Sequence, residues 1–268
     1  MVGFLLTLTS QLLASVPSLN DCPDMIFIDG LQNDSLPSGG SGGMFPGAST
    51  RTIFVNSSLG VRTYYAYVPT TYQPSEPLPL MFLWHGAGGP GTAPAAAQSV
   101  RDLWESTAEE QRFIIVAQEA TGTTGGGFIP ANAENVLLAI LADMEDNYNI
   151  ELNRIYGWGF SSGGHVMHDK ALERTDIFAA YAVNAGILAA AATVVAPLNA
   201  DRELPVYVSV GSSDSLLSFA QNDRLNFINA GWVEGKNYWL DVFAGGHVLP
   251  NDAPGKAWDK ICISTVLD

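Results

Sequence analysis

The chain has 268 residues, of which 47% are hydrophobic and 15% charged, so it is long enough to bury a sizeable core and is most simply one domain. Its formal net charge of −15 argues against nucleic acid or an anionic membrane as a partner, because binding to either needs clustered Lys and Arg. The interior holds no run of about eighteen apolar residues, so no membrane span is predicted.

The N-terminal part divides into two segments. Residues 1–19 have the apolar centre and small-residue end of a secretory signal but lack the usual early Lys or Arg, and a helix of the mature protein is the alternative. Residues 20–50 include a Gly/Ser/Pro-rich stretch that cannot fold by itself, and they are predicted to be a tether lying on the domain. Residues 51–268 are predicted to form that domain.

The two cysteines, Cys22 and Cys262, lie near opposite ends of the chain. This placement suits one disulfide in an oxidising compartment and, with the signal-like start, predicts a secreted protein. Two unrelated thiols are the alternative. No C-x-x-C motif or His/Cys cluster is present, so no metal site is predicted.

The first predicted elements form a hairpin. Thr52–Val55 and Arg62–Val68 are rich in β-branched and aromatic residues, and the turn-like stretch Asn56–Gly60 separates them. Later runs are short and nearly continuously apolar, as in strands covered on both faces. These runs are Leu80–Trp84, Phe113–Ala117, Ile155–Tyr156, Phe178–Val183, Val206–Val210 and Tyr238–Phe243.

Helical patterns lie between these strands. Apolar residues recur at three- and four-residue intervals most clearly at Leu137, Ile140, Leu141, Met144 and Tyr148. The alternation of strand and helix predicts an α/β fold: a mostly parallel central sheet with helices on both faces and an antiparallel N-terminal edge. Functional residues are then expected at the carboxyl ends of the strands.

A Gly-x-Ser-x-Gly pentapeptide spans residues 159–163, with an apolar run before it and a helical pattern after it. In this context Ser161 is expected at the tip of a sharp turn between strand and helix. Gly159 and Gly163 leave room for the two elements to approach closely. A plain Gly/Ser-rich loop is the alternative.

Two more polar residues follow predicted strands: Asp214 ends Gly211–Asp214, and His247 ends Gly245–His247. A serine hydroxyl is a poor nucleophile until a base takes its proton, and a neutral imidazole suits that task near pH 7. His247 is therefore the predicted base for Ser161, and Asp214 is predicted to orient its ring. The order Ser, Asp, His along the chain is that of α/β-hydrolases.

Rival residues exist for both partner roles. His165 and His168 lie on the helix that runs away from Ser161, so a packed or solvated role is expected for each. His85 belongs to the Gly-rich loop His85–Gly89. Asp241 is a rival acid, but it lies inside a predicted strand, where a covered sheet disfavours charge.

The loop His85–Gly89 is predicted to form an oxyanion hole, in which the backbone N–H groups of Ala87 and Ser162 face the developing negative charge. An ordinary Gly-rich turn is the alternative. A phosphate-binding loop is disfavoured because the G-x-x-x-x-G-K-[ST] spacing is absent.

Five segments in this order resemble secreted feruloyl esterases and polyhydroxybutyrate depolymerases of the α/β-hydrolase superfamily: Arg62–Pro69, Leu83–Gly89, Gly159–Gly164, Gly211–Asp214 and Gly245–His247. The resemblance covers about residues 51 to 250 and implies an α/β-hydrolase fold. It matches Ser161, Asp214 and His247 to the family's triad and Ala87 to its oxyanion position. The family often has the sequence Gly-His-Thr-Trp-Pro-Gly around the histidine, whereas this chain has Gly-His-Val-Leu-Pro-Asn at Gly246–Asn251. The aromatic residue of the family pattern is therefore missing beside His247.

The sequence therefore predicts a serine carboxylic-ester hydrolase of feruloyl esterase or polyhydroxybutyrate depolymerase type, which forms an acyl-enzyme on Ser161 and needs no metal or cofactor. Small or oligomeric esters are the expected substrates. Ile187–Pro197 is either part of an acyl pocket or a buried helix, and Trp84, Trp158, Trp232, Trp239 and Trp258 are expected in the core first. A serine peptidase or acyltransferase is the alternative function, followed by a non-catalytic binding protein.

Overall fold

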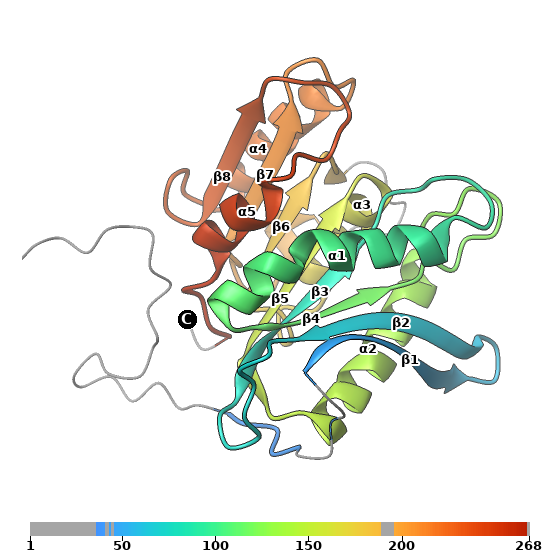
Figure 1. The fold of residues 1–268 in the computed structure, drawn as a ribbon. Helices are drawn as coiled ribbons and strands as arrows, with labels where there is room; N and C mark the ends of the chain where they lie inside the picture. The colour runs from blue at the N-terminus through green and yellow to red at the C-terminus, as the bar shows by residue number, and fades with distance from the viewer. Residues whose placement is uncertain (1–35, 41–42, 44–45, 189–195, 267–268) are drawn as a thin grey trace, which may run out of the picture.

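The computed structural model describes residues 36–40, 43, 46–188 and 196–266, and Figure 1 shows their arrangement. The predicted signal-like segment 1–19, Cys22 and much of the predicted tether lie outside these residues. Cys262 is buried, and its pairing with Cys22 stays a prediction. Within the described ranges, no helix is both long enough and apolar enough to cross a membrane.

The described strands form one eight-stranded sheet in the order β1-β2-β4-β3-β5-β6-β7-β8. Their bounds are β1 (Gly47–Asn56), β2 (Gly60–Val68), β3 (Leu78–Trp84), β4 (Ile114–Gln118), β5 (Ile150–Phe160), β6 (Ala180–Asn184), β7 (Val206–Gly211) and β8 (Tyr238–Phe243). The pairs β1–β2 and β2–β4 are antiparallel, and the remaining neighbours are parallel. The predicted mostly parallel sheet with an antiparallel N-terminal edge is confirmed.

Helices cover both faces of this sheet, as predicted. They are α1 (Ala93–Gln111), α2 (Pro130–Asn147), α3 (Ser162–Glu173), α4 (Leu217–Asn229), α5 (Ala253–Ile261) and the 3-10 helix η2 (Pro197–Asn199). Helices α1 and α5 pack on one face, in front of the sheet in Figure 1, and α2, α3 and α4 pack on the other. The core is accordingly divided into two apolar layers, one on each side of the sheet.

Strand β5 is longer than the short run Ile155–Tyr156 that apolarity indicated. Its first half contains Glu151 and Asn153, which are buried although polar. Other segments of the chain supply hydrogen bonds to this half of the strand. The N–H of Leu36 donates to Oε1 of Glu151, and the N–H of Val266 donates to the carbonyl of Asn153. These partners are distant in sequence, so local hydrophobicity could not indicate them.

Strand β8 lies at the edge of the sheet, with β7 as its neighbour. The expectation that it is covered on both faces is wrong, because most of its residues are partly exposed. Trp239 on this strand is partly exposed for the same reason, whereas the other four expected core tryptophans are buried: Trp84, Trp158, Trp232 and Trp258.

Helix α5 is held to the front of the sheet by Trp258, whose ring stacks on Phe113 at a centroid distance of 3.8 Å. Because Trp258 is 1% exposed, Trp258→Ala should lower the free energy of unfolding by about 3 to 5 kcal/mol, measured by urea denaturation. The control Val242→Ala, on the exposed side of β8, should change it by about 0.5 kcal/mol or less. Equal losses in the two variants would contradict this view of the core.

Candidate active site

Ser161 lies at the turn between β5 and α3, as the pentapeptide predicts. Its backbone has φ 51° and ψ −116°, in a region that residues with a side chain rarely adopt. The neighbouring chain holds this conformation: the N–H of Ser161 donates to the carbonyl of Asn184 at 2.9 Å, and the N–H of His165 donates to the carbonyl of Ser161 at 2.9 Å. The nucleophile candidate is thus held between β6 and its own helix.

The glycines of the pentapeptide are required by close contacts. A Cβ on Gly159 would lie 2.4 Å from the carbonyl oxygen of Gly163, and a Cβ on Gly163 would lie 2.2 Å from that of Trp84. Both clashes are with backbone, which cannot move aside as a flexible side chain can. Strand β5, helix α3 and the end of β3 therefore meet at positions where only glycine fits.

The structure brings Ser161, His247 and Asp214 into one hydrogen-bonded series. Nε2 of His247 lies 2.8 Å from Oγ of Ser161, and Nδ1 of His247 lies 2.8 Å from Oδ2 of Asp214. A carboxylate can only accept, so Nδ1 donates to Asp214, and in the neutral ring Nε2 is then the acceptor for the serine hydroxyl. This is the protonation state that a general base for Ser161 requires.

The two partners of Ser161 have different environments. The Asp214 side chain is fully buried, and its second oxygen accepts the N–H of Leu216 at 2.9 Å. The His247 side chain is 40% exposed, and its ring lies against Phe160, with centroids 5.3 Å apart. The acid is therefore fixed, while the base stays open to solvent. Sequence reasoning missed Phe160, because the variable position of a Gly-x-Ser-x-Gly motif carries no signal.

Ala87 and Ser162, the predicted oxyanion donors, both lie close to Gly127. A Cβ on Gly127 would be 2.7 Å from Oγ of Ser162 and 3.4 Å from Cβ of Ala87. Ser162 is the first residue of α3, so its N–H has no acceptor within the helix. Both predicted donors therefore lie close to Gly127, and Ser162 directly follows Ser161 in the chain.

The segment Gly122–Phe128, which follows β4, supports the loop His85–Gly89. Sequence reasoning missed this segment. The N–H of Gly89 donates to the carbonyl of Gly125 at 2.9 Å, and the N–H of Phe128 donates to Oγ of Ser162 at 3.2 Å. The available signal was the glycine-rich stretch Gly122–Gly127, a few residues after a predicted strand.

His85 is a buried support for the same loop. Its Nε2 accepts the N–H of Ala120 at 3.1 Å, so Nδ1 carries the proton and donates to the carbonyl of Gly86 at 2.7 Å. Burial lowers the pKa of His85, which favours this neutral form. The ring joins the end of β3 to the chain after β4. It takes no part in the hydrogen bonds that link Ser161, His247 and Asp214.

The helical histidines point away from the Ser161 hydroxyl, as predicted. His168 is fully buried against Tyr181, whose hydroxyl lies 3.0 Å from Nδ1, and burial lowers the pKa of His168 to about 3. His165 contacts the backbone of Ile187 instead, through Nδ1. This contact is more specific than the packed or solvated role expected for His165.

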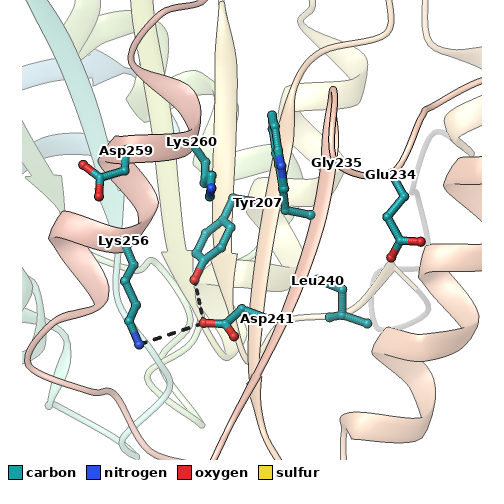
Figure 2. A pocket seen from close by; sticks show the side chains of 9 residues that line it. Tyr207, Glu234, Gly235, Leu240, Asp241, Lys256, Asp259 and Lys260 are labelled. Atoms are coloured by element: carbon teal, nitrogen blue, oxygen red, sulfur yellow. Dashed lines mark hydrogen bonds and ion pairs between the residues drawn. The ribbon is translucent and has the colours of Figure 1, made fainter. Parts of the chain in front are cut away.

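Asp241, the rival acid, has other partners. Its Oδ2 accepts the hydroxyl of Tyr207 at 3.0 Å and lies 4.0 Å from Nζ of Lys256, as Figure 2 shows. A cavity of about 380 Å³ lies here, lined by Tyr207, Trp239, Asp241, Lys256 and Lys260 among others. Tyr207 and Trp239 stand near the amino ends of β7 and β8, whereas Asp214 and His247 follow the carboxyl ends. The cavity is therefore separate from the Ser161 site.

A metal site is not found in the described part of the chain, where no three His, Cys, Asp or Glu side chains are grouped to hold an ion. The donors around Ser161 are those of acid–base and nucleophilic chemistry, namely a hydroxyl, an imidazole and a carboxylate.

The close packing around Ser161 predicts that a methyl group added there destabilises the protein, whereas one added at an uncrowded glycine does not. Gly163→Ala should lower the free energy of unfolding by about 1 to 3 kcal/mol or prevent folding, because the new Cβ meets the Trp84 carbonyl. Gly255→Ala is the matched control, since its Cβ would meet nothing within 4 Å in α5, and it should stabilise by up to about 1 kcal/mol. Urea denaturation of both variants checks this, and a Gly163→Ala protein as stable as the wild type would contradict it.

No protein-family model matches the chain. Two of its curated relatives are each 27% identical to it over 161 residues. One is a bifunctional acetylxylan esterase/xylanase from Neocallimastix patriciarum, with 60% of this chain and 22% of the relative aligned. The other is a probable feruloyl esterase C from Aspergillus flavus, with 59% of this chain and 57% of the relative aligned. The chain thus matches about a fifth of one relative and just over half of the other.

Among solved structures, the chain is similar to a CE1 ferulic acid esterase from the anaerobic fungus Anaeromyces mucronatus. The TM-score is 0.62 at 16% identity, and the match covers 84% of this chain and 93% of the other. Sequence identity at this level supports a shared fold alone. The sheet order and strand directions described above agree with that fold. The chain has the α/β-hydrolase fold and resembles feruloyl esterases in both sequence and structure.

Proposed function

We propose that this protein is a serine carboxylic-ester hydrolase that works through an acyl-enzyme on Ser161. The observation that carries the proposal is the hydrogen-bonded series from Ser161 through His247 to Asp214. It lies at the carboxyl ends of β5, β7 and β8, where open α/β sheets bind their ligands. The names of the sequence relatives, an acetylxylan esterase and a feruloyl esterase, support ester chemistry over other uses of the same residues.

In the proposed mechanism, Oγ of Ser161 attacks the ester carbonyl carbon while Nε2 of His247 takes the hydroxyl proton. Asp214 keeps the proton on Nδ1 and stabilises the imidazolium that forms. His247 then gives its proton to the departing alcohol, which leaves the acyl group on Ser161. A water molecule repeats the sequence, with His247 as its base, and releases the carboxylic acid.

The oxyanion of each tetrahedral intermediate is proposed to face the N–H groups of Ala87 and Ser162. Donors aimed at developing charge contribute about 3 to 4 kcal/mol each in comparable hydrolases. The Gly122–Phe128 segment and His85 support this arrangement, because both fix the loop that carries Ala87. Neither a metal nor a cofactor has a step in this reaction.

Within ester hydrolases, we propose the feruloyl esterase type, acting on small or oligomeric esters, with a polyhydroxybutyrate depolymerase as the alternative. The names of the sequence relatives, a probable feruloyl esterase C and a bifunctional acetylxylan esterase/xylanase, support this type. Secretion, and a disulfide between Cys22 and Cys262, belong to this proposal as well. A peptidase or acyltransferase would use the same series, so substrate assays must distinguish these activities.

Ser161→Ala should abolish ester turnover while leaving the fold intact, with a loss of about a million-fold in comparable triads. Initial rates on 4-nitrophenyl acetate, methyl ferulate, a hydroxybutyrate oligomer and a peptide anilide measure this and rank the substrates. Ser99→Ala, on the exposed surface of α1, is the control and should keep full activity. Retained hydrolysis in Ser161→Ala would refute the assignment, and anilide turnover without ester turnover would favour a peptidase.

Asp214→Asn should lower kcat by about ten-thousand-fold with little change in KM, because an amide supports the wrong tautomer of His247. Asp241→Asn is the matched control, since that carboxylate contacts Tyr207 and Lys256 instead, and its rates should stay within about twofold of the wild type. The proposal fails if the two variants lose activity to the same extent.

A further inference from the structure

Phe160 ends a row of aromatic side chains on one face of β5. Successive side chains of a strand point to opposite faces, so Tyr156, Trp158 and Phe160 share one face. Tyr156 and Trp158 are buried in the apolar layer beneath α1 and α5, and Phe160 packs against that layer while staying partly exposed. The row therefore ends in a half-buried ring at the carboxyl end of β5, directly before the nucleophile.

Two groups of the proposed active site lie against this ring. Gly86 of the loop His85–Gly89 is so close that a Cβ there would lie 2.8 Å from Cδ1 and 3.0 Å from Cε1 of Phe160. The ring of His247 has its centroid 5.3 Å from that of Phe160, with 31° between the two planes. Phe160 therefore contacts both the proposed oxyanion loop and the proposed base, and a residue without a Cβ at position 86 leaves room for it.

The hydrogen bonds of His247 leave one motion of its ring unrestrained. Asp214 binds Nδ1 and Ser161 binds Nε2, which fixes the positions of the two nitrogen atoms. Neither bond fixes the tilt of the ring about the line that joins these atoms. The His247 side chain is 40% exposed, so packing restrains it only in part. The contact with Phe160 on one face of the imidazole supplies a restraint on this tilt.

The same contact acts on charge. In the proposed reaction His247 becomes an imidazolium each time it takes a proton, first from Ser161 and then from water. The face of an aromatic ring attracts a cation that lies within about 6 Å of the ring centroid. The 5.3 Å separation of the two rings is within that range. A neutral imidazole gains less from this attraction, so the contact is stronger in the transition state than in the resting enzyme, which is the condition for a faster reaction.

We propose that Phe160 is a positioning residue, whose ring fixes the tilt of His247 and stabilises the imidazolium through a cation–π contact. The inference rests on the proposed ester hydrolysis and adds a residue to its machinery. Phe160 acts through His247 and does not touch the reacting atoms. A wall that contacts the substrate is the competing role, and the two roles differ in their kinetics.

The test replaces Phe160 with 4-fluoro-, 3,5-difluoro- and pentafluorophenylalanine through an amber codon. Fluorine withdraws electron density from the face of the ring and nearly preserves its shape, so the cation–π contact weakens while packing stays. Both kcat and kcat/KM for 4-nitrophenyl acetate should fall together at each step, by about tenfold with pentafluorophenylalanine, and KM should stay within about twofold. Equal falls in kcat and kcat/KM identify an interaction made only in the transition state.

Methyl ferulate is the second ester, and it differs from the first in both its acyl group and its alcohol. The same stepwise loss is expected on both, because both reactions form the same imidazolium. Phe160→Leu, which keeps an apolar side chain without an aromatic face, should lower kcat by at least about tenfold with KM within about twofold.

The matched control is pentafluorophenylalanine at Phe54, which is 68% exposed on β1. This variant should keep both rates within about twofold of the wild type. Urea denaturation of the Phe160 series should give unchanged midpoints, so that rates are compared between equally folded proteins.

The possible failures are distinguishable. Wild-type protein that cleaves neither ester overturns the proposed function and, with it, the inference. Active wild-type protein whose kcat does not change along the fluorinated series overturns the inference and leaves the function standing. A rise in KM at constant kcat, or a loss on one ester only, also overturns the inference, because the ring of Phe160 would then contact the substrate.

Discussion

The site depends on the close contact between β5 and α3 at Ser161. The serine backbone has a positive φ, which costs about 1 to 3 kcal/mol, and it persists because the surrounding structure determines it from several sides. Gly159 and Gly163 allow the strand, the helix and the carbonyl of Trp84 to meet without a Cβ between them. The amide of Ser161 is bound to Asn184, so the turn is tied to β6 as well. This geometry directs Oγ of Ser161 toward His247.

The parallel direction of β5, β7 and β8 explains why residues far apart in sequence meet. The carboxyl ends of parallel strands share one edge of the sheet, so the loops after them bring Asp214 and His247 to Ser161. Asp214 is buried and bound by a backbone amide, while His247 is partly exposed beside Phe160. A fixed acid and an accessible base are what the proposed proton transfers require.

Tertiary contacts also revise how single residues are understood. Asp241 was disfavoured as the acid because a covered strand excludes charge, yet β8 is a partly exposed edge strand that tolerates it. The better reason is that Asp241 binds Tyr207 and Lys256, at a distance from Ser161. His165 was expected to be merely packed or solvated, and it instead binds the backbone beyond β6.

The sequence by itself determined the fold class, the N-terminal hairpin and the strand–turn–helix around Ser161, because hydrophobic periodicity and glycine spacing are local properties of the chain. It also indicated Ser161, Asp214 and His247 as a set, through their positions after predicted strands. Only the tertiary structure decided the length of β5, the edge position of β8, the packing of Gly122–Phe128 against the Ala87 loop and the contacts that His165 and Phe160 make. Those features depend on contacts between residues distant in sequence, and local patterns do not encode which distant groups meet.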